Sequence, residues 1–446
     1  MFEEKKIFKS QTSSLFIANE YLKKCRNKGI NVDISPLCDF VMWADCIGHQ
    51  KLLLLKNNKD FSINFFKNFI KELLAIGKNY EFSKFTSEIK TTNKINIVYS
   101  YCTKENFSRN GFFYDSYFNQ SSLSEKNTYW FLISLDNYVP KKCNNVFIIY
   151  RKKKLFNFIY LIKFILKNIF ERNVLHNCNN TTNVSQLYSK HFYETFNKFK
   201  FNLYLPYENR PHQNAIIKVA KKISKKNKVY GYYHRMPEPF QGEMIYKVKD
   251  LDKLYVCSQI QKEVFYKYLY WPKKKISTIF SIRYFKLKKR KNCIFVPFEI
   301  KNGEFYLKKL KSFLQSTKIY TNKIKVSIHP LKKKDKDHLN FKRKIYEVLR
   351  EVKHQELKNK KQKNYSIILG EPGGVASECL QATGQVYHIS DSDFDIFSEK
   401  IWKTIKVIKI SDYLYKYIKL KKHNFLNING KKNNFRQLLS CNKMVN

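Results

Sequence analysis

The sequence predicts an α/β protein with two domains, each built on a parallel β-sheet that helices cover. Three observations predict this class. The chain has 446 residues, which is long for a single hydrophobic core. Short strand-like runs alternate with helical segments, a pattern typical of βαβ units and parallel sheets. The alternation begins again after the basic stretch 286–292, which we expect to be a linker between two Rossmann-like domains facing a central cleft.

The first domain is expected to span residues 91–285, after a mostly helical region at 1–90 that includes a helix at 61–76. β-Branched and aromatic residues dominate the runs that predict its strands, at 95–101, 129–135, 146–150, 201–206, 229–234 and 254–257. Between two of these strands, Ile216, Ile217, Ala220 and Ile223 fall on one stripe. This spacing predicts a helix at 214–225 and therefore a βαβ unit.

The second domain is expected to span residues 293–410. Its predicted strands are 293–297, 324–329, 365–369 and 386–389, and its predicted helices are 305–314, 341–352 and 375–382. The remaining tail, 411–446, is expected to be helical and to pack back across the domains.

The composition excludes a mainly disordered chain, because 43% of the residues are hydrophobic and 16% are aromatic. The 85 Lys and Arg residues against 36 Asp and Glu give a net charge of +49. The basic runs are short and lie throughout the chain, and Lys, Asn, Ile, Phe and Tyr are abundant as A/T-rich codons would produce. We therefore attribute most of the charge to composition and expect no specific nucleic-acid partner.

One apolar segment, 155–170, follows the basic run 151–154 and is interrupted by Lys163 and Lys167. It is too short to span a membrane. Two interpretations remain open: a helix in peripheral contact with an anionic membrane, or a core helix whose two lysines reach solvent.

The ten cysteines include no CxxC pair, and the charged start of the chain lacks the apolar core of a secretory signal. We expect a cytoplasmic protein with free thiols and no zinc site.

Glycine is scarce, yet four of the twelve residues fall close together, at Gly370, Gly373, Gly374 and Gly384. The Gly373–Gly374 doublet lies between a predicted strand and a helix that carries Ser377 and Glu378 in its first turn. Exposed amides at such a helix N-terminus form an anion site suited to phosphate. The alternative is a tight turn with an ordinary glycine cap at Gly384.

Four of the ten prolines stiffen two loops at the ends of adjacent predicted strands, at Pro206, Pro211, Pro237 and Pro239. These loops carry Glu208, Arg210, His212, His234 and Arg235, a set that could serve as general acid and base, although each residue alone could be a surface residue or a helix cap. His329-Pro330 ends another predicted strand, where the imidazole could donate to a phosphate or simply begin a turn.

Together these segments resemble bacterial surface-carbohydrate (capsule or O-antigen) biosynthesis proteins of the GT-B glycosyltransferase type, similar to sialyltransferases and Kdo transferases. LPYENRPHQNAIIKVAKK, VYGYYH, DKLYVCSQ and WPKKKISTIFSIRY are similar to the acceptor side, and KVSIHP and GEPGGVASECLQATGQVYHI to the donor side. The likeness covers residues 95–410.

The resemblance implies an inverting transfer from a nucleotide sugar, with a CMP-sugar favoured, to a surface polysaccharide or lipid-linked glycan. It implies a donor site at His329, Pro330, Gly373, Gly374, Ser377 and Glu378, and acceptor contacts at Arg210, His212 and Arg235. It makes Glu208 the candidate general base and His234 the alternative.

No cofactor or metal is expected. Asp391-Ser392-Asp393 matches the DxD motif of metal-dependent GT-A enzymes, but it follows the last predicted strand and is read as an acidic loop. A non-catalytic carbohydrate-assembly protein with the same fold, and a basic nucleic-acid-binding protein, are the alternatives.

Overall fold

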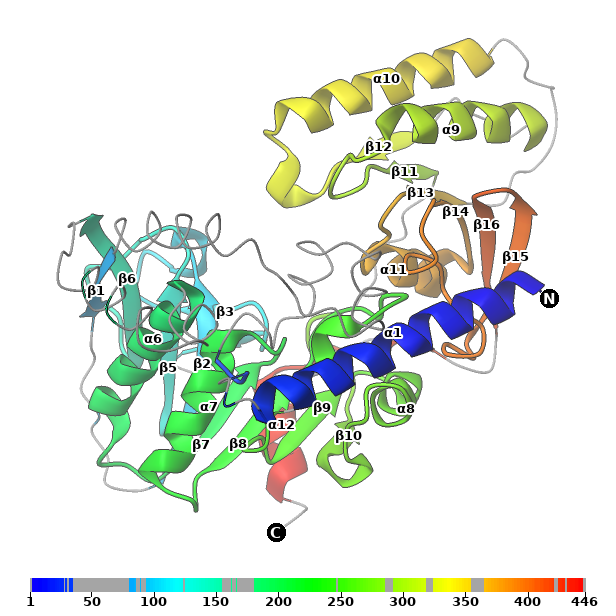
Figure 1. Ribbon diagram of the computed structural model, residues 1–446. Coiled ribbons are helices and arrows are strands. Elements are labelled where there is room, and N and C mark those ends of the chain that lie inside the picture. The colour runs from blue at the N-terminus through cyan, green and yellow to red at the C-terminus, as the bar shows by residue number, and fades with distance from the viewer. Residues whose placement is uncertain are drawn as a thin grey trace.

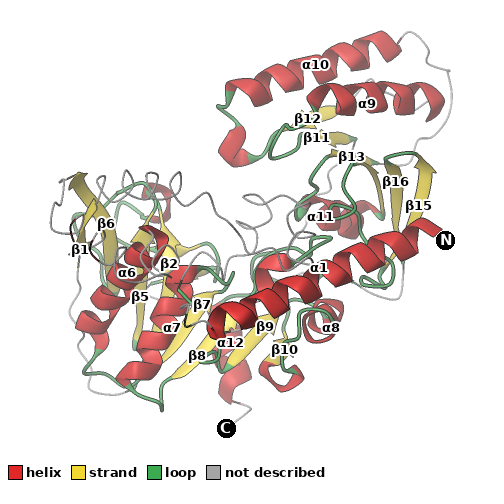
Figure 2. Cartoon of the chain, viewed as in Figure 1, coloured by secondary structure: helices red, strands yellow, loops and turns green. Residues whose placement is uncertain are grey.

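The computed structural model contains two β-sheets with helices packed on them (Figures 1 and 2). It describes residues 2–27, 29, 32–34, 80–85, 89, 94–122, 125–154, 162, 166, 180–245, 248–284, 292–317, 324–353, 365–420, 424–429 and 431–443. The helices predicted at 61–76 and 155–170 and the linker predicted at 286–292 lie outside these residues, apart from Ile162, Leu166 and Asn292.

The first sheet has the strand order β1-β6-β5-β2-β7-β8-β9-β10. Its strands are β1 (Tyr80–Phe85), β2 (Ile95–Cys102), β5 (Thr128–Ser134), β6 (Val146–Lys154), β7 (Phe201–Pro206), β8 (Lys228–Tyr232), β9 (Lys253–Val256) and β10 (Ile276–Thr278). All are parallel except the edge strand β1. Numbered along the chain from β2, the parallel strands run 3-2-1-4-5-6-7, so the order reverses between β2 and β7, as in doubly wound nucleotide-binding folds.

The second sheet has the order β12-β11-β13-β14-β16-β15. Its parallel strands are β11 (Cys293–Phe295), β12 (Lys325–Ser327), β13 (Ser366–Leu369) and β14 (Gln385–Ile389). Numbered from β11 these run 2-1-3-4, a second doubly wound order, whose reversal lies between β11 and β13. The prediction of an α/β protein with two parallel sheets is therefore confirmed.

The predicted helical tail is wrong at its start. β15 (Ile405–Ser411) and β16 (Leu414–Lys419) form an antiparallel hairpin that extends the second sheet beyond the border expected at 410. The reason is the β-branched and aromatic content of these runs: Leu414, Tyr415 and Tyr417 are buried in the hairpin. Helix returns only at α12 (Phe435–Lys443).

Helices lie on both sheets. They are α6 (Asn180–Phe196), α7 (Pro211–Ile223) and α8 (Gln259–Lys267) with the first sheet, and α9 (Gly303–Thr317), α10 (Lys336–Lys353) and α11 (Val375–Thr383) with the second. Helix α7 follows the predicted pattern, because Ile216, Ile217 and Ala220 are buried on one stripe and Pro211 occupies the first turn. No helix among the described residues is long and apolar enough to cross a membrane.

Helix α1 (Phe2–Asn27) packs on both domains and runs diagonally past them (Figure 1). Gln11 Nε2 donates to Asp393 O at 2.9 Å and to Ile396 O at 2.8 Å, which ties the helix to the second domain. The ring of Phe8 contacts Tyr268, just beyond α8 of the first domain, with centroids 6.1 Å apart. The helix therefore bridges the two domains.

Helix α12 returns to the first sheet although it follows the second in sequence. Phe435 is fully buried there, with ring centroids 4.9 Å from Tyr204, 5.6 Å from Phe118 and 6.3 Å from Trp130. The C-terminal segment is thus part of the core of the first domain.

Phe435→Ala is expected to lower the free energy of unfolding by about 3 to 5 kcal/mol, because the ring leaves a cavity among large aromatic neighbours. Urea denaturation measures the change. Phe16→Ala, at a phenylalanine of α1 that is 55% exposed, is the control and should cost far less. Equal losses for both variants would show that α12 does not contribute to the core.

Candidate active site

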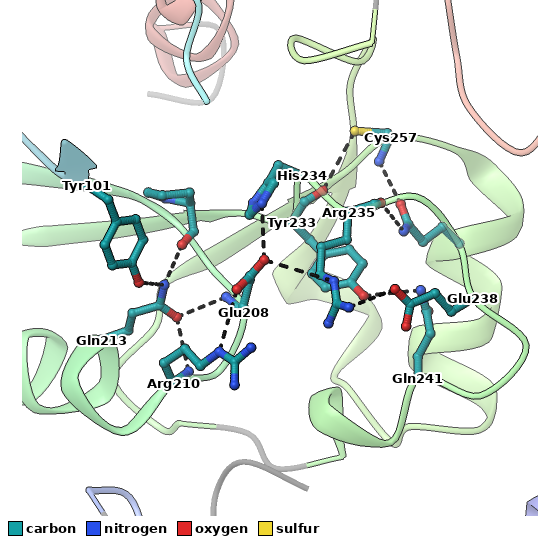
Figure 3. A network of polar contacts seen from close by, with 12 residues as sticks. Tyr101, Glu208, Arg210, Gln213, Tyr233, His234, Arg235, Glu238, Gln241 and Cys257 are labelled. Atoms are coloured by element: carbon teal, nitrogen blue, oxygen red, sulfur yellow. Dashed lines mark hydrogen bonds and ion pairs between the residues drawn. The ribbon is translucent and has the colours of Figure 1, made fainter. Parts of the chain in front are cut away.

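Glu208 lies where ligands bind in doubly wound sheets, just beyond the carboxyl end of β7 and next to β2. The side chain of Gln213, on α7, fixes this loop. Its Oε1 accepts hydrogen bonds from the amides of Glu208 (2.9 Å) and Arg210 (3.1 Å), and its Nε2 donates to Pro206 O (2.6 Å) and to Tyr101 Oη (3.2 Å). These bonds hold the Glu208 backbone at the edge of the sheet (Figure 3).

Glu208 contacts the imidazole of His234, which follows the adjacent strand β8 (Figure 3). Glu208 Oε1 is 3.1 Å from His234 Nε2 and 4.0 Å from Arg235 Nε, and Oε2 is 3.6 Å from Arg210 Nε. Burial alone would raise the pKa of Glu208, but the hydrogen bond with His234 and the two guanidinium groups outweigh it and lower the pKa well below its usual range. The carboxyl group is therefore ionised at neutral pH.

His234 is 2% exposed, and burial lowers its pKa, so the ring is neutral at pH 7. A neutral imidazole that donates from Nε2 to Glu208 carries its lone pair on Nδ1. Nδ1 has no hydrogen-bond partner among the described residues. The ring of Tyr117 packs edge-on against the imidazole, with centroids 4.6 Å apart. The pair can therefore accept a proton at His234 Nδ1 while Glu208 holds the ring.

The predicted acceptor residues divide into two groups. Arg210 and Arg235 lie beside Glu208, and Arg235 Nη2 also donates to Glu238 Oε1 at 2.7 Å. His212 is instead packed among aromatic rings, where its Nδ1 is 2.7 Å from Tyr99 Oη and burial lowers its pKa to about 3. His212 is thus a core residue in this structure.

The glycine-rich loop of the second domain packs on the loop that carries His234. A Cβ atom on Gly374 would lie 2.7 Å from Met236 Cβ, and the buried Ser377 hydroxyl donates to Pro237 O. Gly373 has a φ of +48° and open space where a side chain would be. The doublet therefore provides a close approach between domains as well as a turn. The Ser377 proton, expected to serve a phosphate, is committed to Pro237.

The other predicted donor residues lie farther apart. Glu378 is half-buried, and its charge helps burial to raise the pKa of Tyr284. His329 is exposed and Pro330 follows it; its ring contacts Phe298 at 5.0 Å, and β12 is separated from β13 by one strand, or about 10 Å. Among the described residues, no interaction joins His329 to Glu208 or His234. The structure therefore brings Gly374 and Ser377 toward the pair but not His329.

Asp391 and Asp393 are engaged in loop contacts. Asp391 accepts from Tyr306 Oη at 3.1 Å and from Asn302, and Asp393 lies 3.5 Å from Lys6 Nζ. No group of three or more potential metal ligands occurs in the part of the chain that the structure describes.

Asp115 positions Tyr117, a site residue that sequence motifs do not reveal. The buried Asp115 Oδ1 accepts from the amides of Tyr117 (2.8 Å) and Phe118 (3.0 Å). Burial raises the pKa of Asp115 to about 6, although its hydrogen bonds act to lower it. The folded state therefore binds this proton more tightly than the unfolded chain, whose carboxyl has its ordinary pKa of about 3.9.

The stabilising contribution of the Asp115 proton is complete below about pH 4 and is lost as the pH rises through 6. We expect Asp115→Asn to gain roughly 2 to 3 kcal/mol relative to wild type between pH 4 and pH 7.5. Urea denaturation at the two pH values measures this difference. Asp337→Asn, at a surface position of α10, should show none. A constant difference between wild type and Asp115→Asn would contradict the expectation.

Comparison with known proteins yields distant structural matches alone. No protein-family model matches the chain, and no curated protein matches it significantly. A UDP-forming α,α-trehalose-phosphate synthase from Burkholderia xenovorans aligns over 65% of this chain and 77% of its own, with 10% identity and a TM-score of 0.34. A similar synthase from Burkholderia vietnamiensis aligns over 70% and 90%, with 10% identity and a TM-score of 0.36.

A glycosyltransferase from Rickettsia africae aligns over 69% of this chain and 88% of its own, with 12% identity and a TM-score of 0.31. Similarity at this level does not identify a substrate or a reaction. The strand orders and the contacts of Glu208 and His234 are the firmer observations.

Proposed function

We propose that the protein is a glycosyltransferase that transfers a sugar from a nucleotide-sugar donor to a hydroxyl group of a glycan acceptor. The observation that carries the proposal is the Glu208–His234 pair, with its 3.1 Å contact, at the point where the first sheet reverses its strand order. The loop after β8 that carries His234 also contacts the loop after β13 of the second sheet. Two doubly wound sheets that meet at their carboxyl edges are the arrangement that the GT-B resemblance implies.

His234 is the proposed general base and Glu208 the group that positions it. The acceptor hydroxyl gives its proton to Nδ1, and its oxygen forms a bond to the anomeric carbon of the donor. The bond from that carbon to the phosphate oxygen breaks, and the nucleotide leaves with the bonding electron pair. Glu208 keeps the Nε2 proton in place and stabilises the imidazolium that forms. A single displacement of this kind inverts the configuration of the sugar.

The donor would lie against the second domain, near Gly373 and Glu378, with His329-Pro330 at the far edge of the same sheet. The resemblance favours a CMP-sugar, whereas the names of two structural matches refer to UDP-forming enzymes. A surface polysaccharide or a lipid-linked glycan is the proposed acceptor, and contact with an anionic membrane would suit the second of these.

A screen of CMP-, UDP- and GDP-sugars tests the proposal, with release of free nucleotide followed by mass spectrometry. We expect release from one class of donor, faster in the presence of glycan acceptors. His329→Ala should raise the KM for that donor if the residue contacts the nucleotide. Absence of turnover with every donor and acceptor would favour a non-catalytic role in carbohydrate assembly.

A further inference from the structure

Arg283 is exposed, yet its backbone is fixed relative to the candidate active site. The amides of Ile282 and Arg283 donate to the buried Tyr232 Oη at 3.0 and 3.4 Å. The amide of Tyr284 donates to Ser281 Oγ at 2.9 Å. Because Tyr232 ends β8, two residues before His234, these bonds tie the Arg283 turn to the strand that presents the imidazole.

The guanidinium group of Arg283 lies against two aromatic rings. Its Cζ is 5.4 Å from the ring centroid of Tyr117 and 5.5 Å from that of Tyr284. Tyr117 is the same ring that packs on His234. Such cation–π contacts hold a guanidinium group in place and leave its N–H groups able to donate to another partner.

The charges around the pair leave Arg283 unbalanced. Arg210 pairs with Glu208, and Arg235 pairs with Glu208 and Glu238. In the ranges that the structure describes, no carboxylate forms an ion pair with Arg283. A positioned guanidinium group without a carboxylate, beside a candidate base, is a binding group for an anion.

We propose that Arg283, held between Tyr117 and Tyr284, binds a phosphoryl group of a substrate next to His234. The planar guanidinium group has five N–H donors and binds phosphate oxygens in pairs. The site itself rests on the geometry of Arg283. Its place in a reaction rests on the proposed glycosyl transfer, in which the phosphoryl group belongs either to the leaving nucleotide or to a phosphorylated acceptor.

Isothermal titration calorimetry with inorganic pyrophosphate tests the site without turnover. We expect Arg283→Gln to weaken binding at least tenfold, because charge-assisted hydrogen bonds are lost. Tyr117→Leu should weaken it less, and Tyr117→Phe, which keeps the ring, should not. Arg343→Gln is the matched control, since Arg343 is an exposed arginine of α10 and reports any non-specific attraction to this basic chain.

The two sources of the phosphoryl group give different results. If UDP or CMP displaces pyrophosphate in the wild-type protein but not in Arg283→Gln, the site receives the donor nucleotide. If pyrophosphate still binds at Arg283 in the presence of saturating nucleotide, the site receives a phosphorylated acceptor.

Equal affinity of wild type and Arg283→Gln for pyrophosphate, or no binding by wild type at millimolar concentration, would overturn the proposal. Turnover of a nucleotide sugar that is unaffected by Arg283→Gln would leave the glycosyltransferase in place without this subsite. Arg283-dependent binding without any turnover would retain the subsite and reject the proposed reaction.

Discussion

His234→Gln is expected to reduce the rate of nucleotide release by about 10² to 10⁴-fold, because the amide side chain cannot take the acceptor proton. Glutamine keeps a polar group beside Glu208 Oε1 and so limits the loss of stability. Steady-state kinetics should show the loss mainly in kcat. His191→Gln is the control, since His191 lies on α6 and faces Glu194. If His234→Gln retained wild-type kcat, the imidazole would not be the base.

The same pair predicts a pH dependence. Burial lowers the pKa of His234, so the neutral base persists as the pH falls to 6.5, and kcat/KM should decline only below that value. Glu208→Gln removes the charge and the hydrogen bond that favour the imidazolium, and so should move the decline to still lower pH and reduce kcat. A profile centred above pH 6.5 that is unchanged in Glu208→Gln would assign the titration to another group.

Trp402→Ala is expected to lower the free energy of unfolding by about 3 to 5 kcal/mol, the second large effect that the structure predicts. Trp402 is fully buried in the second domain, with ring centroids 5.8 Å from Phe397 and 6.2 Å from Phe425. Its Nε1 donates to Pro239 O at 3.0 Å. The residue thus supports the loop after β8 that carries His234.

Trp402→Phe separates the two contributions of this side chain. Phenylalanine keeps an aromatic ring in the core but leaves the Pro239 carbonyl without its donor, which costs about 1 to 3 kcal/mol. Urea denaturation of both variants should be compared with Tyr193→Ala, at a tyrosine that is 42% exposed. Stability of Trp402→Ala equal to that of the Tyr193 variant would show that the domain contact contributes little.

Local pattern was sufficient to predict most parallel strands, because fully buried strands are continuous β-branched and aromatic runs. β7 has the predicted bounds, 201–206, and β2, β13 and β14 differ by one residue at an end. The order of the strands is not a local property, so the position of Glu208 at the reversal could not be predicted. What could be predicted was that Glu208 and His234 lie at neighbouring strand ends, and their 3.1 Å contact confirms this.

Residues whose neighbours come from distant segments were beyond sequence reasoning. The scarcity of glycine correctly indicated special backbone geometry at 373–374, but Met236, the group that approaches Gly374, comes from the other domain. Arg283 and Tyr117 belong to no motif. Their relation to His234 depends on a turn fixed by Tyr232 and a loop fixed by Asp115, contacts that exist only in the folded chain.

Helix α1 has a consequence for how substrates enter. Its 26 residues form a rod about 39 Å long, fastened to the second domain by Gln11 and packed on the first through Phe8. Any rotation that separates the domains must bend this rod or release one of its attachments. The rate of substrate exchange is then governed at the N-terminal turns of the helix, remote from the chemistry, and Gln11→Ala would accelerate opening without altering a single residue of the site.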